Sequence, residues 1–461
     1  MSLIRRSAHK HWPVESANIG QKYGCHSERS EESEKYSSRE WMQSTQIPRY
    51  ARNDNQVPKT QMRIFAPAAG NFGLPGVFLL SMNTTKGRVL VAMSGGIDSS
   101  VAAVLLHEQG YEVVGMTMKT WDYASAGGSK KETGCCSLDS INDARQIAVE
   151  LGFPHYIIDI RDEFGDFVIS NFTDEYLAGR TPNPCVLCNT HIKWDALLRR
   201  ADQLGCEFIA TGHYAQVHHE NGRYVISKGV DENKDQSYAL WGVSQESLSR
   251  TLFPLGAMRK TEIYDEARRR GFTELVNKPE SYEICFIPDN DYRGFLKRRV
   301  PGLEERVAGG QFVLRDGTVV GTHAGYPFYT IGQRKGLGVA LGFPVYVTAI
   351  HPETNQVVLG NYEDLASTAT VVGKLNMGKF ASLEGRGLVP STTKVRYNHD
   401  GAPAFLEQVG DKIRVYFEEP VHAITPGQAA VFYDGQDVLG GGWIERHVIG
   451  ELPLPVELAA G

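Results

Sequence analysis

The sequence lacks the features that would place it in a membrane or outside the cell. No apolar run approaches the roughly 18 residues that a membrane-spanning helix needs. The seven cysteines are an odd number and follow no secretory signal, so we expect a reducing, cytoplasmic compartment rather than structural disulfides. The formal net charge of −6 also gives no sign of a uniformly basic protein, so any nucleic-acid partner must meet local basic clusters.

The length of 461 residues is enough for two or three domains, and the 41% of apolar residues can build their cores. Residues 1–83 are an exception, because they carry few aliphatic residues and no lasting periodicity. We expect them to form a disordered N-terminal extension. Their glutamates argue against an organelle transit peptide, and Met82 resembles an internal start.

Segments with strand and helix patterns alternate from residue 87 onward. Strands are expected at 89–93, 111–116, 155–160 and 208–213. A helical pattern over 140–151 ends at Gly152, and this alternation is typical of a doubly wound parallel α/β sheet.

The pattern changes after about residue 292, where the strands become short and glycine divides them. Apolar and polar residues alternate through the last hundred residues, which predicts a small antiparallel β-barrel. We therefore expect a catalytic domain over 84–291, a small β-rich central domain over 292–365 and the barrel over 366–461.

Residues 94–100, Ser-Gly-Gly-Ile-Asp-Ser-Ser, join the first expected strand to a helix. Glycines lack a Cβ, so backbone N–H groups can approach an anion there, and the positive end of the helix adds to the attraction. The spacing matches neither the common P-loop nor the dinucleotide-binding fingerprint. It resembles instead the pyrophosphate loop (PP-loop) of ATP pyrophosphatases, which split ATP between the α and β phosphates and pass AMP to a substrate.

Two cysteines follow two prolines in residues 181–189, Thr-Pro-Asn-Pro-Cys-Val-Leu-Cys-Asn. Because proline fixes φ, the pattern predicts a stiff turn for Cys185 and Cys188, followed by a helix over 190–200. A place near a helix N-terminus lowers the pKa of a thiol and favours the nucleophilic thiolate. Another cysteine, Cys285, lies among apolar residues, and we expect three more to be peripheral: Cys135, Cys136 and Cys206.

Eight short motifs occur in the order found in the bacterial tRNA-specific 2-thiouridylase family. Besides 94–99 and 181–189, they are residues 118–121, 211–214, 234–238, 284–287, 332–336 and 425–428. The resemblance runs from about residue 86 to 445. It implies a three-domain enzyme of the PP-loop superfamily that replaces the 2-oxygen of the wobble uridine of certain tRNAs with sulfur.

The resemblance also implies the order of the chemistry. AMP is first transferred to the uridine 2-oxygen, which turns a poor leaving group into a good one, and Mg²⁺ is expected to neutralise the triphosphate. The sulfur-carrying persulfide is assigned to Cys285 and the partner role to Cys188, with a transient disulfide between them after sulfur release. A persulfide donor protein, a cysteine desulfurase or a sulfur-relay protein, is the expected second partner.

Matching to the same motifs assigns the binding residues. ATP contacts are expected from Ala92, Met93, Ser94, Gly95, Gly96, Ile97, Asp98, Ser99, Met118 and Gly212. Contacts to tRNA are expected from Asn183, Pro184, Cys185, His213, Lys234, Asp235, Gln236, Arg396, Tyr397 and Gln428. The basic clusters in 293–299 and 332–336 are further candidates for tRNA phosphates.

Cys185 departs from the commonest family pattern, in which an aspartate follows Asn-Pro as a plausible proton-transfer group. The departure creates a Cys-x-x-Cys pair, and Cys285 would complete three thiolates for Zn²⁺ or a [4Fe–4S] cluster. A cluster-binding RNA module or a cluster-dependent thiolase is therefore an alternative. We favour the cluster-free scheme, because Cys188 and Cys285 alone account for sulfur delivery and release. A PP-loop amide ligase is the other alternative, but it would require no paired cysteines and no glutaminase domain is apparent.

Overall fold

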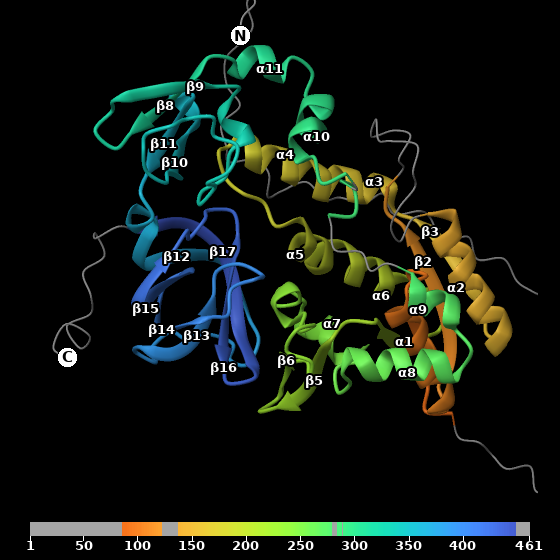
Figure 1. Ribbon diagram of the computed structural model, residues 1–461. Coiled ribbons are helices and arrows are strands. Elements are labelled where there is room, and N and C mark those ends of the chain that lie inside the picture. The colour runs from red at the N-terminus through yellow and green to blue at the C-terminus, as the bar shows by residue number, and fades with distance from the viewer. Residues whose placement is uncertain (1–84, 122–136, 279–283, 288, 449–461) are drawn as a thin grey trace, which may run out of the picture. The chain divides into compact units, whose positions relative to one another are not determined.

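We describe residues 85–121, 137–278, 284–287 and 289–448 of the computed structural model (Figure 1). All of them belong to one compact unit of the chain, Leu80–Gly461. The expected extension over 1–83 lies outside the described residues, as do Cys135 and Cys136. Within the described ranges, no helix combines the length and the apolar composition needed to cross a membrane.

A five-stranded parallel sheet in the order β3-β2-β1-β4-β7 forms the first domain. Its strands are β1 (Arg88–Ala92), β2 (Glu112–Lys119), β3 (His155–Asp159), β4 (Phe208–Ala210) and β7 (Thr251–Leu252). The strand order reverses between β1 and β4, and ligands of such sheets bind beyond the carboxyl ends of the strands at that reversal. The parallel α/β sheet predicted from the sequence is confirmed.

Helices cover both faces of this sheet. Val89 and Val91 of β1 pack with α1 (Ile97–Glu108), α2 (Leu138–Leu151) and α8 (Lys260–Arg269). Leu90 points to the opposite face and its cluster includes residues of α6 (Trp194–Gln203). Further α-helices described in this domain are α3 (Arg161–Phe164), α4 (Ser170–Leu177), α5 (Pro184–Cys188), α7 (Gln245–Ser249) and α9 (Thr273–Asn277). Burial of β1 on both faces explains its continuous apolar sequence.

The segment that carries Cys185 and Cys188 is helical, so the predicted stiff turn is wrong. Helix α5 continues through a π-helical turn at Asn189–Lys193 directly into α6. Pro184 occupies the first helical position, where its missing N–H group costs nothing, and the side chain of Asn183 caps the helix by accepting from the Val186 amide at 3.3 Å. Cys185 therefore lies in the first turn and Cys188 beyond it, which removes the basis for a thiol pKa lowered by the helix N-terminus at Cys188.

The central part of the chain forms a small mixed sheet. Two helices precede it, α10 (Tyr292–Arg299) and α11 (Leu303–Val307). The sheet has the order β10-β11-β8-β9, and its strands are β8 (Gly310–Leu314), β9 (Val319–His323), β10 (Tyr346–His351) and β11 (Gln356–Gly360). The short strands expected after residue 292 are thus present, and the basic cluster at 293–299 lies on α10.

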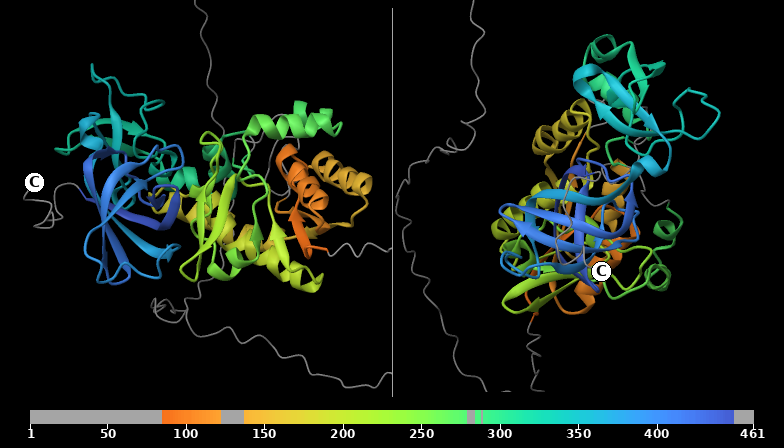
Figure 2. Two further views of the ribbon diagram at one scale, coloured as in Figure 1. Left: turned by 90° about the horizontal axis from the view of Figure 1, so that it is seen from below. Right: turned by 90° about the vertical axis from the view of Figure 1, so that its left-hand side faces the viewer.

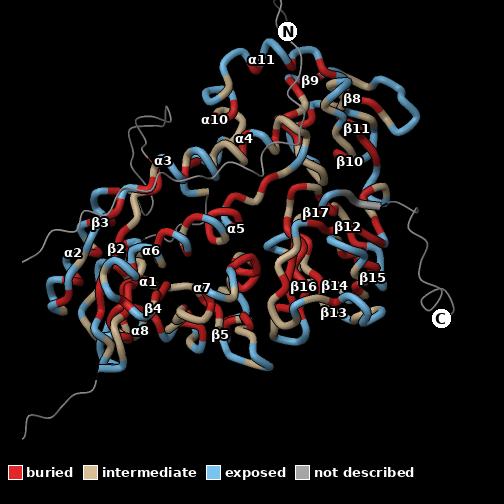
Figure 3. Tube along the Cα trace, turned by 180° about the vertical axis from the view of Figure 1, so that it is seen from behind, coloured by how far each residue is buried: buried red, intermediate tan, exposed pale blue. Residues whose placement is uncertain are grey.

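The last part of the chain is a closed antiparallel barrel (Figure 2). Its strands are β12 (Ala366–Met377), β13 (Val389–Lys394), β14 (Ala402–Val409), β15 (Lys412–His422), β16 (Ala429–Asp434) and β17 (Asp437–Val448). They follow the order β12-β15-β14-β13-β16-β17, and pairing of β17 with β12 closes the ring. The predicted barrel is confirmed, and buried residues run along β16 and β17 (Figure 3).

One hairpin of the first domain extends the sheet of the barrel. Its strands are β5 (Ala215–Glu220) and β6 (Arg223–Lys228). β6 pairs with β17 through Ser227 and Asp437, and Ser227 also donates a hydrogen bond from its hydroxyl to the Asp437 carboxylate at 2.7 Å. The barrel is therefore joined to the chain that follows β4 in the parallel sheet.

Candidate active site

The glycine-rich turn after β1 is held by its own serines. The amide of Ser94 donates to Oγ of Ser99 at 3.0 Å, and that hydroxyl donates to the carbonyl oxygen of Gly96 at 3.1 Å. Gly96 is the N-cap of the 12-residue helix α1 and provides no side-chain cap to its first N–H groups. Those groups and the helix dipole are therefore available to an anion, as a phosphate site requires.

Two positions of the site must be glycine, because neighbouring backbone atoms lie too close for any side chain. Gly95 has a φ of +71°, and a Cβ built on it would collide with the carbonyl oxygen of Ser140 at the start of α2. A Cβ on Gly212, just after β4, would lie 2.8 Å from the amide nitrogen of Ser99. Any larger residue at Gly212 would push the chain after β4 away from the start of α1, so these contacts fix the shape of the turn.

The predicted ATP-binding residues divide into two groups by burial. Met93 and Ile97 are 2% and 6% exposed and belong to the core beneath the turn, so only their backbones can face a nucleotide. Ser94 is exposed. Met118 lies near the carboxyl end of β2 and Gly212 follows β4, so both lie at the sheet edge where the turn lies.

The carboxylate of Asp98 is held by two residues that the sequence analysis did not single out for this role. It accepts a hydrogen bond from the Tyr214 hydroxyl at 2.5 Å and pairs with Nζ of Lys260 at 2.7 Å. Lys260 is buried, with only 8% of its side chain exposed. Asp98 therefore neutralises a buried lysine beside the turn, and the sequence spacing between them gave no signal of the pair.

A second lysine, Lys278, also contacts the turn. Nζ of Lys278, at the C-cap of α9, lies 3.4 Å from the carbonyl oxygen of Gly95, 2.9 Å from Oγ of Ser140 and 2.8 Å from a carboxylate oxygen of Asp143. Sequence reasoning missed this residue as well, because an isolated lysine before a proline carries no recognisable pattern.

The start of α5 gathers tRNA-binding candidates from distant parts of the chain. The side-chain amide of Gln428 donates to the carbonyl oxygens of Thr181 and Pro182 at 3.2 and 2.8 Å. The buried hydroxyl of Tyr238 donates to the carbonyl oxygen of Ala429 in the barrel at 2.9 Å, and its ring packs edge-on against that of Tyr397 at 5.9 Å. The barrel and the first domain thus both contribute residues around this helix.

Residues 235 and 236 connect this region to the glycine-rich turn. Gln236 is hydrogen bonded to the backbone of Tyr214 in both directions, at 2.9 Å each, while the Tyr214 hydroxyl contacts Asp98. The backbone carbonyl of Asp235 accepts from the Tyr397 hydroxyl at 3.2 Å. The carboxylate of Asp235 is used within its own loop, where it accepts from Ser237 and Gly229. A continuous chain of contacts therefore runs from α1 to the barrel.

The four cysteines within the described ranges differ in exposure, and none of the four forms a disulfide. Cys185 is open to solvent but surrounded by many protein atoms, and this desolvation raises the pKa of its thiol against the opposing charge of Lys193. Cys188 is buried in the same apolar cluster as Phe286, the residue after the exposed Cys285. Cys206 is buried as well.

The three thiols proposed as cluster ligands do not meet in this structure. Among the described residues, the one group of three potential metal ligands whose atoms all lie within 4.8 Å of one another is His218, Glu220 and Asp437. Cys185, Cys188 and Cys285 are all described and do not form such a group.

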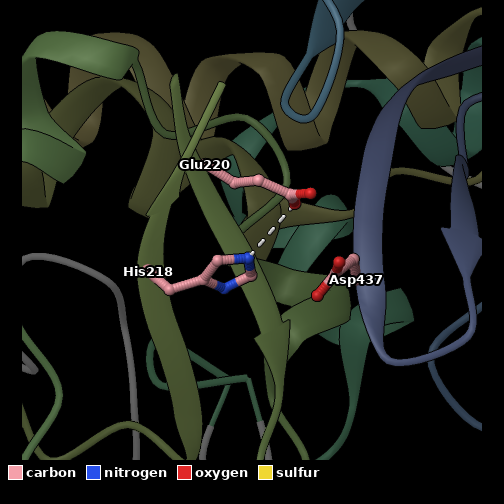
Figure 4. Close-up of side chains that lie close together, drawn as sticks. All are labelled: His218, Glu220 and Asp437. Carbon is pink, nitrogen blue, oxygen red and sulfur yellow. Dashed lines mark ion pairs between the residues drawn. The ribbon is translucent and has the colours of Figure 1, made fainter. Parts of the chain in front are cut away.

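The group of His218, Glu220 and Asp437 lies where the β5–β6 hairpin meets β17 (Figure 4). Nε2 of His218 is 3.6 Å from Glu220. Asp437 is already engaged, because one oxygen accepts from Ser227 and the other pairs with Lys379 at 2.9 Å. The ammonium group of Lys379 therefore already neutralises the Asp437 carboxylate that a metal ion would need. His218, Glu220 and Asp437 fit a structural junction better than a metal site.

His213 lies next to Gly212 and is shielded by aromatic rings. Its ring packs near Trp194 and Phe253, with centroids 5.7 and 6.4 Å apart, and its Nδ1 is 2.8 Å from the Thr211 hydroxyl. Desolvation, with a smaller effect from the charge of Lys193, lowers the pKa of His213 from 6.5 to about 3. The imidazole is therefore neutral at physiological pH, and its expected contact with tRNA cannot be a charge contact to phosphate.

Several basic side chains outside the first domain that are candidates for tRNA contact already interact with other groups of the protein. On α10, Lys297 pairs with Glu304 at 2.6 Å, and the Arg293 guanidinium lies over the Tyr329 ring at 5.6 Å. Arg334 and Lys335 are exposed in the segment before β10. In the barrel, exposed Arg396 donates to the carbonyl oxygen of His422 at 3.2 Å.

Family models match the chain in three consecutive parts. The tRNA methyl transferase HUP domain matches residues 87–289, the tRNA methyl transferase PRC-barrel domain 293–361 and the Aminomethyltransferase beta-barrel domain 379–444. Among solved structures, NMN synthetase from Francisella tularensis overlaps 44% of this chain and 69% of its own, at 17% identity and a TM-score of 0.27. A likeness that distant decides nothing about the site.

Curated relatives are far more similar. The tRNA-specific 2-thiouridylase MnmA of Amoebophilus asiaticus is 74% identical over 360 residues, which cover 78% of this chain and 96% of the relative. The proteins of the same name from Cytophaga hutchinsonii and Salinibacter ruber are 73% and 62% identical and are covered to 98% and 95%.

The fold and the family models define a protein that joins a HUP-type parallel sheet to a PRC-barrel domain and a β-barrel. With relatives of this identity and coverage, the chain belongs to the tRNA-specific 2-thiouridylase family. The resemblance carried by the eight motifs is thereby confirmed.

Proposed function

We propose that this protein uses ATP to replace the 2-oxygen of the wobble uridine of tRNA with sulfur. One observation carries the proposal, in a chain 74% identical to a tRNA-specific 2-thiouridylase: the glycine-rich turn and the cysteine-bearing helix α5 lie at the same sheet edge. The turn follows the carboxyl end of β1. The helical segment that begins with α5 ends with α6, just before the amino end of β4, so its start lies toward the carboxyl ends of the strands, where doubly wound sheets bind ligands.

ATP is the expected ligand of the turn. The N–H groups at the start of α1 would receive its phosphates, while Met118 and Gly212, at the ends of β2 and β4, would contact the adenosine. The carboxylates beside the turn, Asp98 and Asp143, already hold Lys260 and Lys278. Mg²⁺ would be supplied with the triphosphate, whose charge it would neutralise.

The first step forms one bond and breaks one. The uridine 2-oxygen attacks the α-phosphorus of ATP, the bond to the β-phosphate oxygen breaks, and pyrophosphate leaves with the electron pair. Cys185 stands where a carboxylate would be a proton acceptor, but its raised pKa keeps it a thiol at neutral pH. We therefore assign Cys185 a hydrogen-bonding role toward the base instead of general-base catalysis.

The second step transfers the sulfur. The terminal sulfur of a persulfide on Cys285 attacks C2 of the uridine, and AMP leaves with the 2-oxygen. The thiolate of Cys188 then attacks Sγ of Cys285 and breaks its bond to the transferred sulfur, which stays on the base as 2-thiouridine. The two cysteines end as a disulfide, so an external thiol must reduce it and a persulfide donor must reload Cys285 before the next turnover.

tRNA is proposed to lie across all three domains. The anticodon loop is single-stranded, so a wobble base can turn into a pocket at little cost. Residues around the start of α5 would receive the base, and Arg334 and Lys335, with α10, would meet phosphates. In this division 84–291 performs the chemistry, 292–365 contacts tRNA and 366–461 closes over α5. We place the reaction in the cytoplasm, where tRNA is available.

The test combines two measurements. Purified protein, Mg²⁺, ATP and tRNA should release pyrophosphate only when tRNA is present, and mass spectrometry of nucleosides should find 2-thiouridine at the wobble position when a persulfide donor is added. A deletion strain should lack that nucleoside and regain it with this gene. Pyrophosphate release that ignores tRNA would refute the proposal, as would stable metal binding without turnover.

A further inference from the structure

The glycine-rich turn has a charged neighbour that the proposed mechanism has not used. Lys278 extends its ammonium group over the turn, where it contacts the Gly95 carbonyl, Ser140 and Asp143. One third of its side chain is exposed to solvent, and the same fraction of Asp143 is exposed. The side chain of Lys278 is thus held at the turn and remains partly accessible to solvent.

The position of Lys278 relative to the phosphate site follows from close packing. Gly95 has no space for a side chain because Ser140, at the start of α2, lies directly against it. Lys278 contacts both of these residues, so its charge lies directly beside the turn. Lys260 pairs with Asp98, the second residue of α1, so both lysines contact residues of the turn or of the helix start.

The two lysines differ in what they can do. Lys260 is 8% exposed and holds both oxygens of Asp98, so it is committed to the protein. Lys278 pairs with a single oxygen of an accessible aspartate, and exposed ion pairs of this kind are weak. A phosphate group with two negative charges competes well with such a partner.

We propose that Lys278 binds the pyrophosphate part of ATP, exchanging Asp143 for phosphate oxygens when the nucleotide occupies the turn. Asp143 is then only the resting partner of the ammonium group, which also contacts the Gly95 carbonyl and Ser140. During AMP transfer the charge on the bridging oxygen and the leaving pyrophosphate increases, so a cation at this place stabilises the transition state as well as the bound substrate.

The inference rests on the proposed use of ATP, but its test needs neither tRNA nor sulfur. Isothermal titration of the full chain with inorganic pyrophosphate in Mg²⁺ buffer measures the site alone. We expect Lys278→Ala to weaken pyrophosphate binding at least tenfold and Lys278→Arg to stay within about threefold of the original protein, since it keeps the charge. Arg145→Ala, an exposed charge on the same helix as Asp143, is the matched control and should change nothing.

Asp143→Asn separates binding from structure. If Lys278 binds the ligand, removal of its resting partner leaves pyrophosphate affinity equal or higher. If Lys278 only fastens α9 to the turn, Asp143→Asn weakens binding as Lys278→Ala does, and the proposal is wrong. This comparison decides even where Lys278→Ala proves unstable. Unchanged affinity in Lys278→Ala also refutes the proposal, whereas absent thiolation with intact lysine-dependent binding refutes only the proposed function.

Discussion

The side-chain amide of Gln428 donates a hydrogen bond to the carbonyl oxygen of Pro182 at 2.8 Å, so a loop of the barrel holds the chain just before α5. We expect Gln428→Ala to lower the free energy of unfolding by about 1–2 kcal/mol, because two bonds of about 1 kcal/mol each are lost. Gln428→Glu should cost more, since a carboxylate faces carbonyl oxygens. Denaturant unfolding measures both, and a glutamate variant as stable as the original protein would contradict the assignment.

Variants of the ion pair between Asp98 and Lys260 can test its effect on stability separately from its effect on activity. Asp98→Ala should lower the free energy of unfolding by about 2–4 kcal/mol, because it removes the carboxylate that pairs with the charge of a buried lysine. The double variant Asp98→Ala with Lys260→Met should recover part of that loss without recovering pyrophosphate release.

Ser94→Ala is the companion of that experiment. Ser94 is exposed, so its replacement should leave thermal unfolding nearly unchanged while tRNA-dependent pyrophosphate release falls sharply. A normal rate of release in both Ser94→Ala and the double variant would mean that the turn does not bind ATP.

Variants of Cys188 and Cys285 should distinguish the adenylation step from the sulfur-transfer step. Cys188→Ser and Cys285→Ser should abolish sulfur transfer, since a hydroxyl cannot carry a persulfide or attack one effectively. Adenylation precedes sulfur attack, so tRNA-dependent pyrophosphate release should survive Cys285→Ser. Its disappearance, measured on a single turnover, would show that the thiol takes part earlier.

Cys185→Asp tests whether a cluster forms. In the cluster-free scheme the variant should retain or improve thiolation by aerobically purified, metal-free protein. A parallel loss of iron and activity would instead identify Cys185 as a cluster ligand, because carboxylate is a harder ligand than thiolate. Anaerobic purification with iron and sulfide analysis provides the control measurement.

The low pKa of His213 predicts how stability depends on pH. The folded pKa of about 3 lies below the ordinary 6.5, so the unfolded state binds the proton first as the pH falls. The contribution of this residue is complete above about pH 6.5 and declines by about 1.4 kcal/mol per pH unit from there toward pH 3. Denaturant unfolding of His213→Phe should show a shallower slope over this range, and parallel slopes would exclude the desolvated histidine.

The sequence predicted the architecture well where periodicity and burial agree. The continuous apolar run at Val89–Val91 belongs to a strand buried on both faces, and Gly152 ends α2 in the left-handed conformation, with a φ of +74°. The alternation in the last hundred residues likewise corresponds to barrel strands such as β15 and β16. In each case one local pattern is enough to define the element.

Residues 181–189 and the two site lysines show why the rest could not be predicted. Two prolines indicate a turn when only φ is considered, but the second one occupies the first helical position, where tertiary contacts from Gln428 fix the chain before it. Lys260 and Lys278 reach the turn over 162 and 183 residues of sequence. Such pairs arise only when the sheet brings the segments together.

The junction of β6 with β17 bears on how the parts of this protein can be exchanged between genes. A fragment that begins at Ala366 would keep Lys379 and Asp437 but lose Ser227, which pairs with Asp437 across the junction. Recombination that moved the barrel alone would therefore separate hydrogen-bonded partners, whereas a change within a loop of the central sheet would not. We therefore expect the hairpin and the barrel to be inherited together, although more than 130 codons lie between them.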